Sequence, residues 1–175
     1  MNENGMDEQQ ILHALNEMLK ADGFTERFLM KKEVFDGEEY TLFVIPNKEE
    51  AYSISLLDDG EEWTLEYLGA HTHISKDEET LREIYERYIK YTLADRMAVA
   101  HLFDEKGVWY RSETAIIPEN IPFEFSQEDK QSAKRNKIVR WSGEVKDETI
   151  RCYLSDLREE VKDDRTKYYF KKIYG

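Results

Sequence analysis

Residues 28–69 read FLMKKEVFDGEEYTLFVIPNKEEAYSISLLDDGEEWTLEYLG, and they carry the clearest signal for the fold of the chain. It contains four runs rich in β-branched and aromatic residues, separated by polar turn sequences. The runs are 28–35, 40–45, 51–56 and 63–69. Asp36-Gly37 between two such runs is a strong hairpin signal, and the alternation of Trp63, Leu65 and Tyr67 is typical of a half-buried strand. We therefore predict an antiparallel meander of four strands.

An amphipathic helix is predicted before the meander. Asp7 is a good N-cap, and Gln10 stands three residues later, where a capping box has its second member. Apolar residues then recur at helical spacing on one face. They are Ile11, Leu12, Leu15, Met18 and Leu19. Asp22-Gly23 supplies the end of the helix, and residues 1–5 before it are expected to be disordered.

A second amphipathic helix is predicted after the meander. Ser75 and Glu78 have the spacing of a capping box, and Glu83 and Arg87 have the spacing of an i,i+4 ion pair. The apolar stripe of this helix consists of Leu81, Ile84, Tyr85, Tyr88 and Ile89. The two helices together are predicted to cover one face of the sheet.

The second half of the chain carries weaker signals. Residues 97–103 either extend the second helix or form a buried strand, and we favour the strand because a turn and a hairpin mate at 108–111 follow. Further expectations are an extended connection with Pro118 and Pro122, a short basic helix capped by Ser126 and Asp129, strands at 137–141 and 149–154, a helix or loop at 157–164, and a strand or docking arm at 167–174.

These patterns predict an α+β fold with an antiparallel β-sheet of about six to eight strands and two main helices on one face. The 175 residues are expected to form a single globular domain, 1–175. Aromatic residues make up 13% of the chain, and chains that stay disordered lack them, so we expect a packed core.

The single cysteine bears on the compartment. Cys152 has no partner for an intramolecular disulfide, which fits a reducing compartment, so we expect a cytoplasmic protein. Cys152 alternates with Ile150 and Leu154, and we interpret it as a small buried hydrophobe on a strand. No apolar run approaches the roughly 20 residues of a spanning helix, and the first residues lack a secretory signal, so no membrane association is expected.

The charge is divided unevenly along the sequence. Residues 1–128 have a net charge of −17, and residues 129–175 have a net charge of +4, which gives −13 for the chain. A surface this acidic repels phosphate backbones, so we expect no non-specific nucleic-acid binding. It attracts a basic partner. The basic and aromatic residues after 129 either bind single strands of nucleic acid or, as we favour, pair internally with the acidic part.

The candidate partner-binding residues lie in an acidic turn beside a tryptophan. They are Asp58, Asp59, Glu61, Glu62 and Trp63. His71 and His73 are candidate metal ligands, because a strand places both on one face. A zinc site needs further ligands, for which Glu66 or Asp77 is the nearest source. His13 and His101 are interpreted as satisfied or half-buried histidines.

Catalytic motifs carry little weight in this sequence. Glu144-Val145-Lys146, with Asp129 upstream, and Glu160-Val161-Lys162 match the short Glu-x-Lys pattern of metal-dependent nucleases. Both matches are close to chance in a chain so rich in Glu and Lys, and the acidity opposes a nucleic-acid substrate. We found no glycine-rich phosphate loop and no Gly-x-Ser-x-Gly motif, and no cofactor is expected.

Three classes of function follow. The leading hypothesis is a non-catalytic acidic binding protein that captures a basic protein partner, as an immunity or antitoxin protein does. The first alternative is an enzyme whose site is assembled from scattered residues around His71, His73 and nearby carboxylates. The second alternative is a structural or regulatory interaction module, in one form a homodimer.

Overall fold

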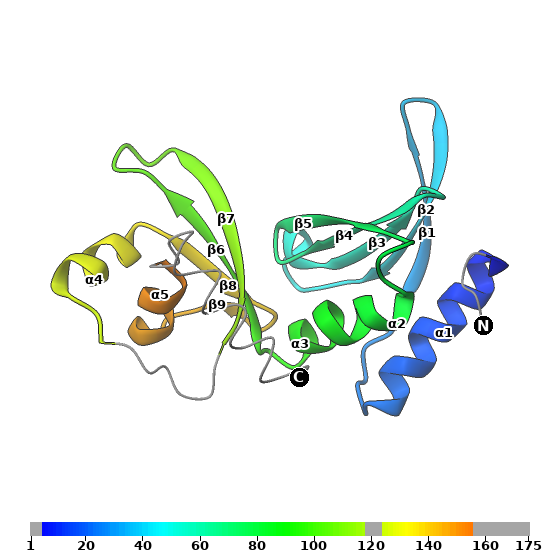
Figure 1. Ribbon diagram of the computed structural model, residues 1–175, viewed down its shortest axis with the longest axis horizontal. Coiled ribbons are helices and arrows are strands. Elements are labelled where there is room, and N and C mark those ends of the chain that lie inside the picture. Colours follow the sequence, from blue (N-terminus) through cyan, green and yellow to red (C-terminus); the bar gives the residue numbers. More distant parts are fainter. Residues whose placement is uncertain (1–4, 118–123, 156–175) are drawn as a thin grey trace. The chain divides into compact units, whose positions relative to one another are not determined.

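The computed structural model describes residues 5–117 and 124–155 (Figure 1). The chain divides into two compact units, Met1–Leu93 and Ala94–Gly175. The predicted α+β class with antiparallel strands is confirmed, and the described strands form two sheets, one of five strands and one of four. The expectation of a single domain stays a prediction. Two compact units can still unfold together in one cooperative step, and their compactness alone does not decide this.

The N-terminal unit is a five-stranded antiparallel meander with helices at both ends. Its strands follow one another in the order β1-β2-β3-β4-β5. The elements are α1 (Glu8–Ala21), β1 (Leu29–Phe35), β2 (Glu38–Ile45), the 3-10 turn η2 (Glu50–Tyr52), β3 (Ile54–Asp58), β4 (Glu62–Tyr67), β5 (Ala70–Ser75), α2 (Leu81–Ile84), the π-helical turn η3 (Tyr85–Ile89) and α3 (Lys90–Leu93). The predicted meander is confirmed, and β5 adds a fifth strand to it. Asp36 and Gly37 have φ of 50° and 84°, as a two-residue hairpin turn requires.

One face of this sheet forms the core of the unit. Phe43, Leu56 and Leu65 lie side by side on neighbouring strands and are fully buried. The helices cover this face: Asn16 of α1 bonds the backbone of Phe28 just before β1, and the Tyr88 ring of η3 lies 5.8 Å from that of Tyr67 in β4. The groove that forms the candidate site lies on the opposite face of the sheet.

The first helix begins as predicted, whereas the second begins later. Asp7 and Gln10 form both hydrogen bonds of the α1 capping box. The prediction that Ser75 caps the second helix was wrong, because Ser75 still belongs to β5 and the capping box is made by Thr80 and Glu83. Since Glu83 is used in this cap, Arg87 instead forms its ion pair with Glu79.

The C-terminal unit is built on a four-stranded sheet in the order β7-β6-β8-β9. Its elements are β6 (Met97–Phe103), β7 (Trp109–Ile116), α4 (Gln127–Lys134), β8 (Lys137–Arg140), β9 (Gly143–Glu144) and α5 (Glu148–Ser155). The prediction of a strand at 97–103 with a hairpin mate is confirmed, and so is the short helix capped by Ser126 and Asp129.

The predicted strand at 149–154 was wrong, because these residues belong to helix α5. Asp147 caps the helix: its carboxylate accepts a hydrogen bond from the Ile150 amide at 2.9 Å. Ile150, Tyr153 and Leu154, at helical spacing i, i+3 and i+4, pack into the core of this unit. The alternation of Ile150, Cys152 and Leu154 had suggested a strand, but the cap and the helical spacing fit the helix.

Several expectations from the sequence lie outside the described residues. They are the disorder of residues 1–4, the connection through Pro118 and Pro122, the helix or loop at 157–164, the second Glu-x-Lys match at Glu160-Val161-Lys162, and the strand or docking arm at 167–174.

An ion pair that joins α1 to the sheet predicts a pH dependence. Glu8 accepts hydrogen bonds from Lys32 of β1 and Thr41 of β2, and these bonds hold the pKa of its carboxyl below the usual value. A lowered pKa in the folded state gives stability that is present above the unfolded pKa and lost as the pH falls through the folded one. We expect Glu8→Gln to lose at most about 1 kcal/mol of unfolding free energy at neutral pH, because the pair is half exposed and screened by solvent.

Urea unfolding of Glu8→Gln and the native chain at several pH values between neutral and acid checks this prediction. The difference between them should shrink once the pH falls below the usual glutamate pKa of about 4.3. Glu17→Gln on the same helix is the control, because Glu17 is exposed and its one ion pair among the described residues is with Lys20, at 3.9 Å. A difference that stays constant down to strong acid would contradict the assignment.

Candidate functional site

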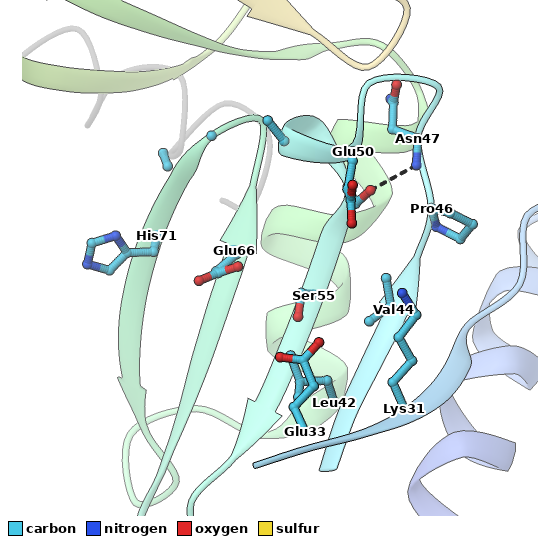
Figure 2. A pocket seen from close by; sticks show the side chains of 14 residues that line it. Lys31, Glu33, Leu42, Val44, Pro46, Asn47, Glu50, Ser55, Glu66 and His71 are labelled. Atoms are coloured by element: carbon cyan, nitrogen blue, oxygen red, sulfur yellow. Dashed lines mark hydrogen bonds between the residues drawn. The ribbon is translucent and has the colours of Figure 1, made fainter. Parts of the chain in front are cut away.

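The face of the five-stranded sheet opposite the helices of this unit carries an open groove with a volume of about 580 Å³ (Figure 2). Leu42 and Val44 of β2 and Ser55 of β3 form its floor. Charged and polar side chains surround the floor and come from β1, β4, β5 and the β2–β3 connection. Those labelled in Figure 2 include Lys31, Glu33, Asn47, Glu50, Glu66 and His71.

The strand register places four of these residues in one row across the sheet. Val44 pairs with Ser55, Ser55 with Glu66, and Glu66 with His71. Neighbouring strands lie about 4.8 Å apart, so the row runs from an apolar side chain through a hydroxyl to a carboxylate and an imidazole over about 14 Å. Val44 and Ser55 line the groove, yet each of them is only 8% exposed.

The rim of the groove is acidic. Glu33, Glu50 and Glu66 are exposed, and none of them forms an ion pair with another described residue. Lys31 is the one lysine or arginine that lines the groove among the described residues. With three carboxylates against one ammonium group, the rim attracts cations and repels anions.

The predicted acidic turn lies between β3 and β4, and its side chains are engaged in different ways. Asp58 pairs with Lys76, whose ammonium group also lies 4.5 Å from the centre of the Trp63 ring. Asp59 accepts hydrogen bonds from the amides of Glu61 and Glu62 and so closes the turn.

The tryptophan of this candidate set is a core residue. Trp63 is only 2% exposed, so it supports the turn from below, and Asp59 and Glu61 are the exposed members of the set. That the turn binds a partner stays a prediction. The turn residues are not among those that line the groove.

His71 and His73 lie on one face of β5, as the sequence predicted, with their rings edge to face and 5.5 Å apart. The carboxylate of Glu62 contacts the pair and lies 2.7 Å from Nδ1 of His73, which also lies 3.1 Å from the Thr64 hydroxyl. Glu66 lies opposite His71 in the register of β4 and β5. Among the described residues no group of three or more His, Cys, Asp or Glu side chains is arranged to hold a metal ion.

The other candidate residues have structural partners in the C-terminal unit. Glu144 and Lys146 pair with each other at 3.1 Å. Asp129 caps α4. His101 contacts the Ser112 hydroxyl at 2.7 Å, which fits a satisfied histidine. In the N-terminal unit His13 is exposed on α1, so the expectation that it lies half-buried was wrong.

Cys152 is buried in α5, and burial raises the pKa of its thiol. A raised thiol pKa lowers the fraction of reactive thiolate at neutral pH. This agrees with the interpretation of Cys152 as a small hydrophobe, although it lies on a helix.

Sequence reasoning missed the groove, although one signal for it was present. Residues 42–45, Leu-Phe-Val-Ile, are apolar at consecutive positions, which indicates a strand that is sheltered on both faces. Phe43 and Ile45 serve the core, and Leu42 and Val44 therefore had to serve a second apolar surface.

The two units differ sharply in charge. Residues 1–93 contain 22 acidic and 9 basic side chains, a net charge of −13, whereas residues 94–175 contain 16 of each and are neutral. The whole net charge of the chain therefore belongs to the unit that carries the groove. Dividing the sequence at residue 128 did not show this difference in charge between the units, because the acidic residues between 94 and 128 belong to the neutral unit.

In the described part of the chain, no helix has both the length and the apolar character needed to cross a membrane. Comparisons with protein-family models, with curated proteins and with solved structures gave no match to this chain.

Proposed function

We propose that this chain is a non-catalytic binding protein whose N-terminal unit captures a basic protein partner. The observation that carries the proposal is the confinement of the net charge of −13 to residues 1–93, the unit with the acidic groove. An immunity or antitoxin protein, acting in the cytoplasm, is the concrete form that we propose.

The physical argument concerns both rate and specificity. A surface of one sign steers an oppositely charged partner toward it and raises the association rate, and it rejects acidic partners by repulsion. Such long-range attraction is screened over about 8–10 Å at physiological salt. Capture by this unit is therefore expected to depend strongly on ionic strength.

The exposed carboxylates of the groove favour a binding role over a purely structural one. Glu33, Glu50 and Glu66 form no ion pair with a described residue, so no internal pairing compensates their mutual repulsion. A cationic partner relieves that repulsion and gains charge-assisted hydrogen bonds. The two alternative functions stay predictions. One is an enzyme with its site around His71 and His73, and the other is a structural or regulatory interaction module.

Affinity capture with the immobilised full chain tests the proposal. We expect a protein of high isoelectric point to be retained from an extract of the native source at low salt, with a Kd that rises at least about tenfold at several-fold higher salt. The matched control is a chain in which Glu33, Glu50 and Glu66 are replaced by Gln, which keeps size and hydrogen-bonding capacity. Retention of an acidic partner only, salt-insensitive retention, or no retained partner would contradict the proposal.

A further inference from the structure

The floor of the groove contains a polar group that is set up for a ligand. Ser55 is only 8% exposed, yet its hydroxyl has no hydrogen-bond partner among the described residues. In Figure 2 Ser55 lies between the strands of Glu66 and Val44, on the face from which the groove opens. The hydroxyl opens to the groove, where a ligand group that forms a hydrogen bond with it takes the place of solvent.

The neighbours of Ser55 define the chemistry of that ligand. Val44 lies one strand away on one side, and the Glu66 carboxylate lies one strand away on the other. Leu42 extends the apolar part of the floor along β2. A ligand that matches this order has an apolar stem followed by a cationic donor within about two strand spacings, or about 10 Å.

Lysine and arginine side chains have this construction. Their methylene stems pack on apolar surfaces while the charged heads donate hydrogen bonds. From these contacts we infer that the groove binds a lysine or arginine side chain in a short extended segment of a partner protein. The stem lies on Leu42 and Val44, and the head donates to Ser55 Oγ and to the Glu66 carboxylate. This inference rests on the proposed function and names the segment by which the basic partner is held.

The size and charge of the groove exclude other occupants. A volume of about 580 Å³ is in the range of pockets for small ligands, so the groove has room for a few residues of an extended segment. The three rim carboxylates Glu33, Glu50 and Glu66 oppose anionic ligands such as phosphates or acidic peptides. Glu33, from β1, is placed to bind a second cation of the same segment (Figure 2).

The test is a titration of the ¹⁵N-labelled full chain with the peptide acetyl-Leu-Arg-Leu-Arg-Leu-amide, followed by NMR at low salt. We expect shifts of the amide signals of Ser55 and Glu66. The variant with Glu33→Gln and Glu66→Gln should bind the peptide at least about tenfold more weakly, and Ser55→Ala about threefold more weakly.

The matched control is the variant with Glu17→Gln and Glu78→Gln. It also removes two negative charges, but from exposed sites outside the groove, and it should weaken binding less than about twofold. Equal weakening by both double variants would overturn the groove as the binding site and leave capture by the acidic unit intact. Absence of shifts in the groove residues would also overturn the inference. Equally tight binding of the peptide with Glu in place of Arg would overturn the proposed function as well.

Discussion

Replacing Phe43 with alanine is expected to lower the unfolding free energy of the N-terminal unit by about 3–5 kcal/mol. Phe43 has no exposed surface and is among the largest fully buried side chains. It lies in β2 between Met30 of β1 and Leu56 of β3, on the face covered by the helices. Neighbouring strands hold the backbone in place, so the core cannot collapse into the space that the ring leaves.

The neighbouring residue provides the control. Leu42→Ala removes an apolar side chain from the same strand but from the half-buried floor of the groove, and should cost about 1 kcal/mol. Urea unfolding measures both, with fluorescence of Trp63 as the probe, because it is the one tryptophan of residues 1–93. Trp109 and Trp141 are replaced by Phe in all the chains compared. Equal costs for Phe43→Ala and Leu42→Ala would show that the two faces are misassigned.

The elements that the sequence predicted well are those whose signals are local. The capping box of Asp7 and Gln10, the Asp36-Gly37 turn and the alternation of Trp63, Leu65 and Tyr67 each involve residues within a few positions of one another. Local hydrogen bonding and the two-residue period of strands decide such elements, whatever surrounds them. The errors arose where two local signals competed. Ser75 and Thr80 both have a glutamate three residues later, but Ser75 is the last residue of β5 and the capping box is formed by Thr80.

The candidate site could not be predicted from residues close together in the sequence, and the reason is geometric. Val44, Ser55, Glu66 and His71 come together only through the registers of three strand pairs, and a shift of one residue in any pair moves a side chain to the other face. In the sequence Ser55 is an ordinary small polar residue of an alternating strand. By contrast, His71 and His73 were correctly placed on one face because they belong to a single strand.

Arg151 shows the same limit in the C-terminal unit, because no pattern in the sequence marks it as important. Its guanidinium donates to three backbone carbonyls from two other segments: Val145 at 2.9 Å, Ala133 at 3.0 Å and Asn136 at 2.6 Å. The side chain is only 15% exposed. Ala133 and Asn136 lie at the end of α4, where a positive charge also stabilises the helix dipole. Arg151 thus joins α5, the end of α4 and the segment after β9.

Replacing Arg151 with alanine is therefore expected to lower the unfolding free energy of the C-terminal unit by about 3 kcal/mol, because three sheltered carbonyls lose a charged donor together. Arg151→Lys should recover less than half of this loss, since one ammonium group cannot reproduce the planar fork of the guanidinium. Lys146→Ala is the control: Lys146 is exposed and, within the part of the chain that the structure describes, pairs only with Glu144, so its loss should stay within about 0.5 kcal/mol. Hydrogen exchange of the buried β8 amides, such as that of Val139, measures the effect within this unit. Full recovery by lysine would show that charge alone matters at position 151, and the forked geometry would then have no part in holding the three segments together.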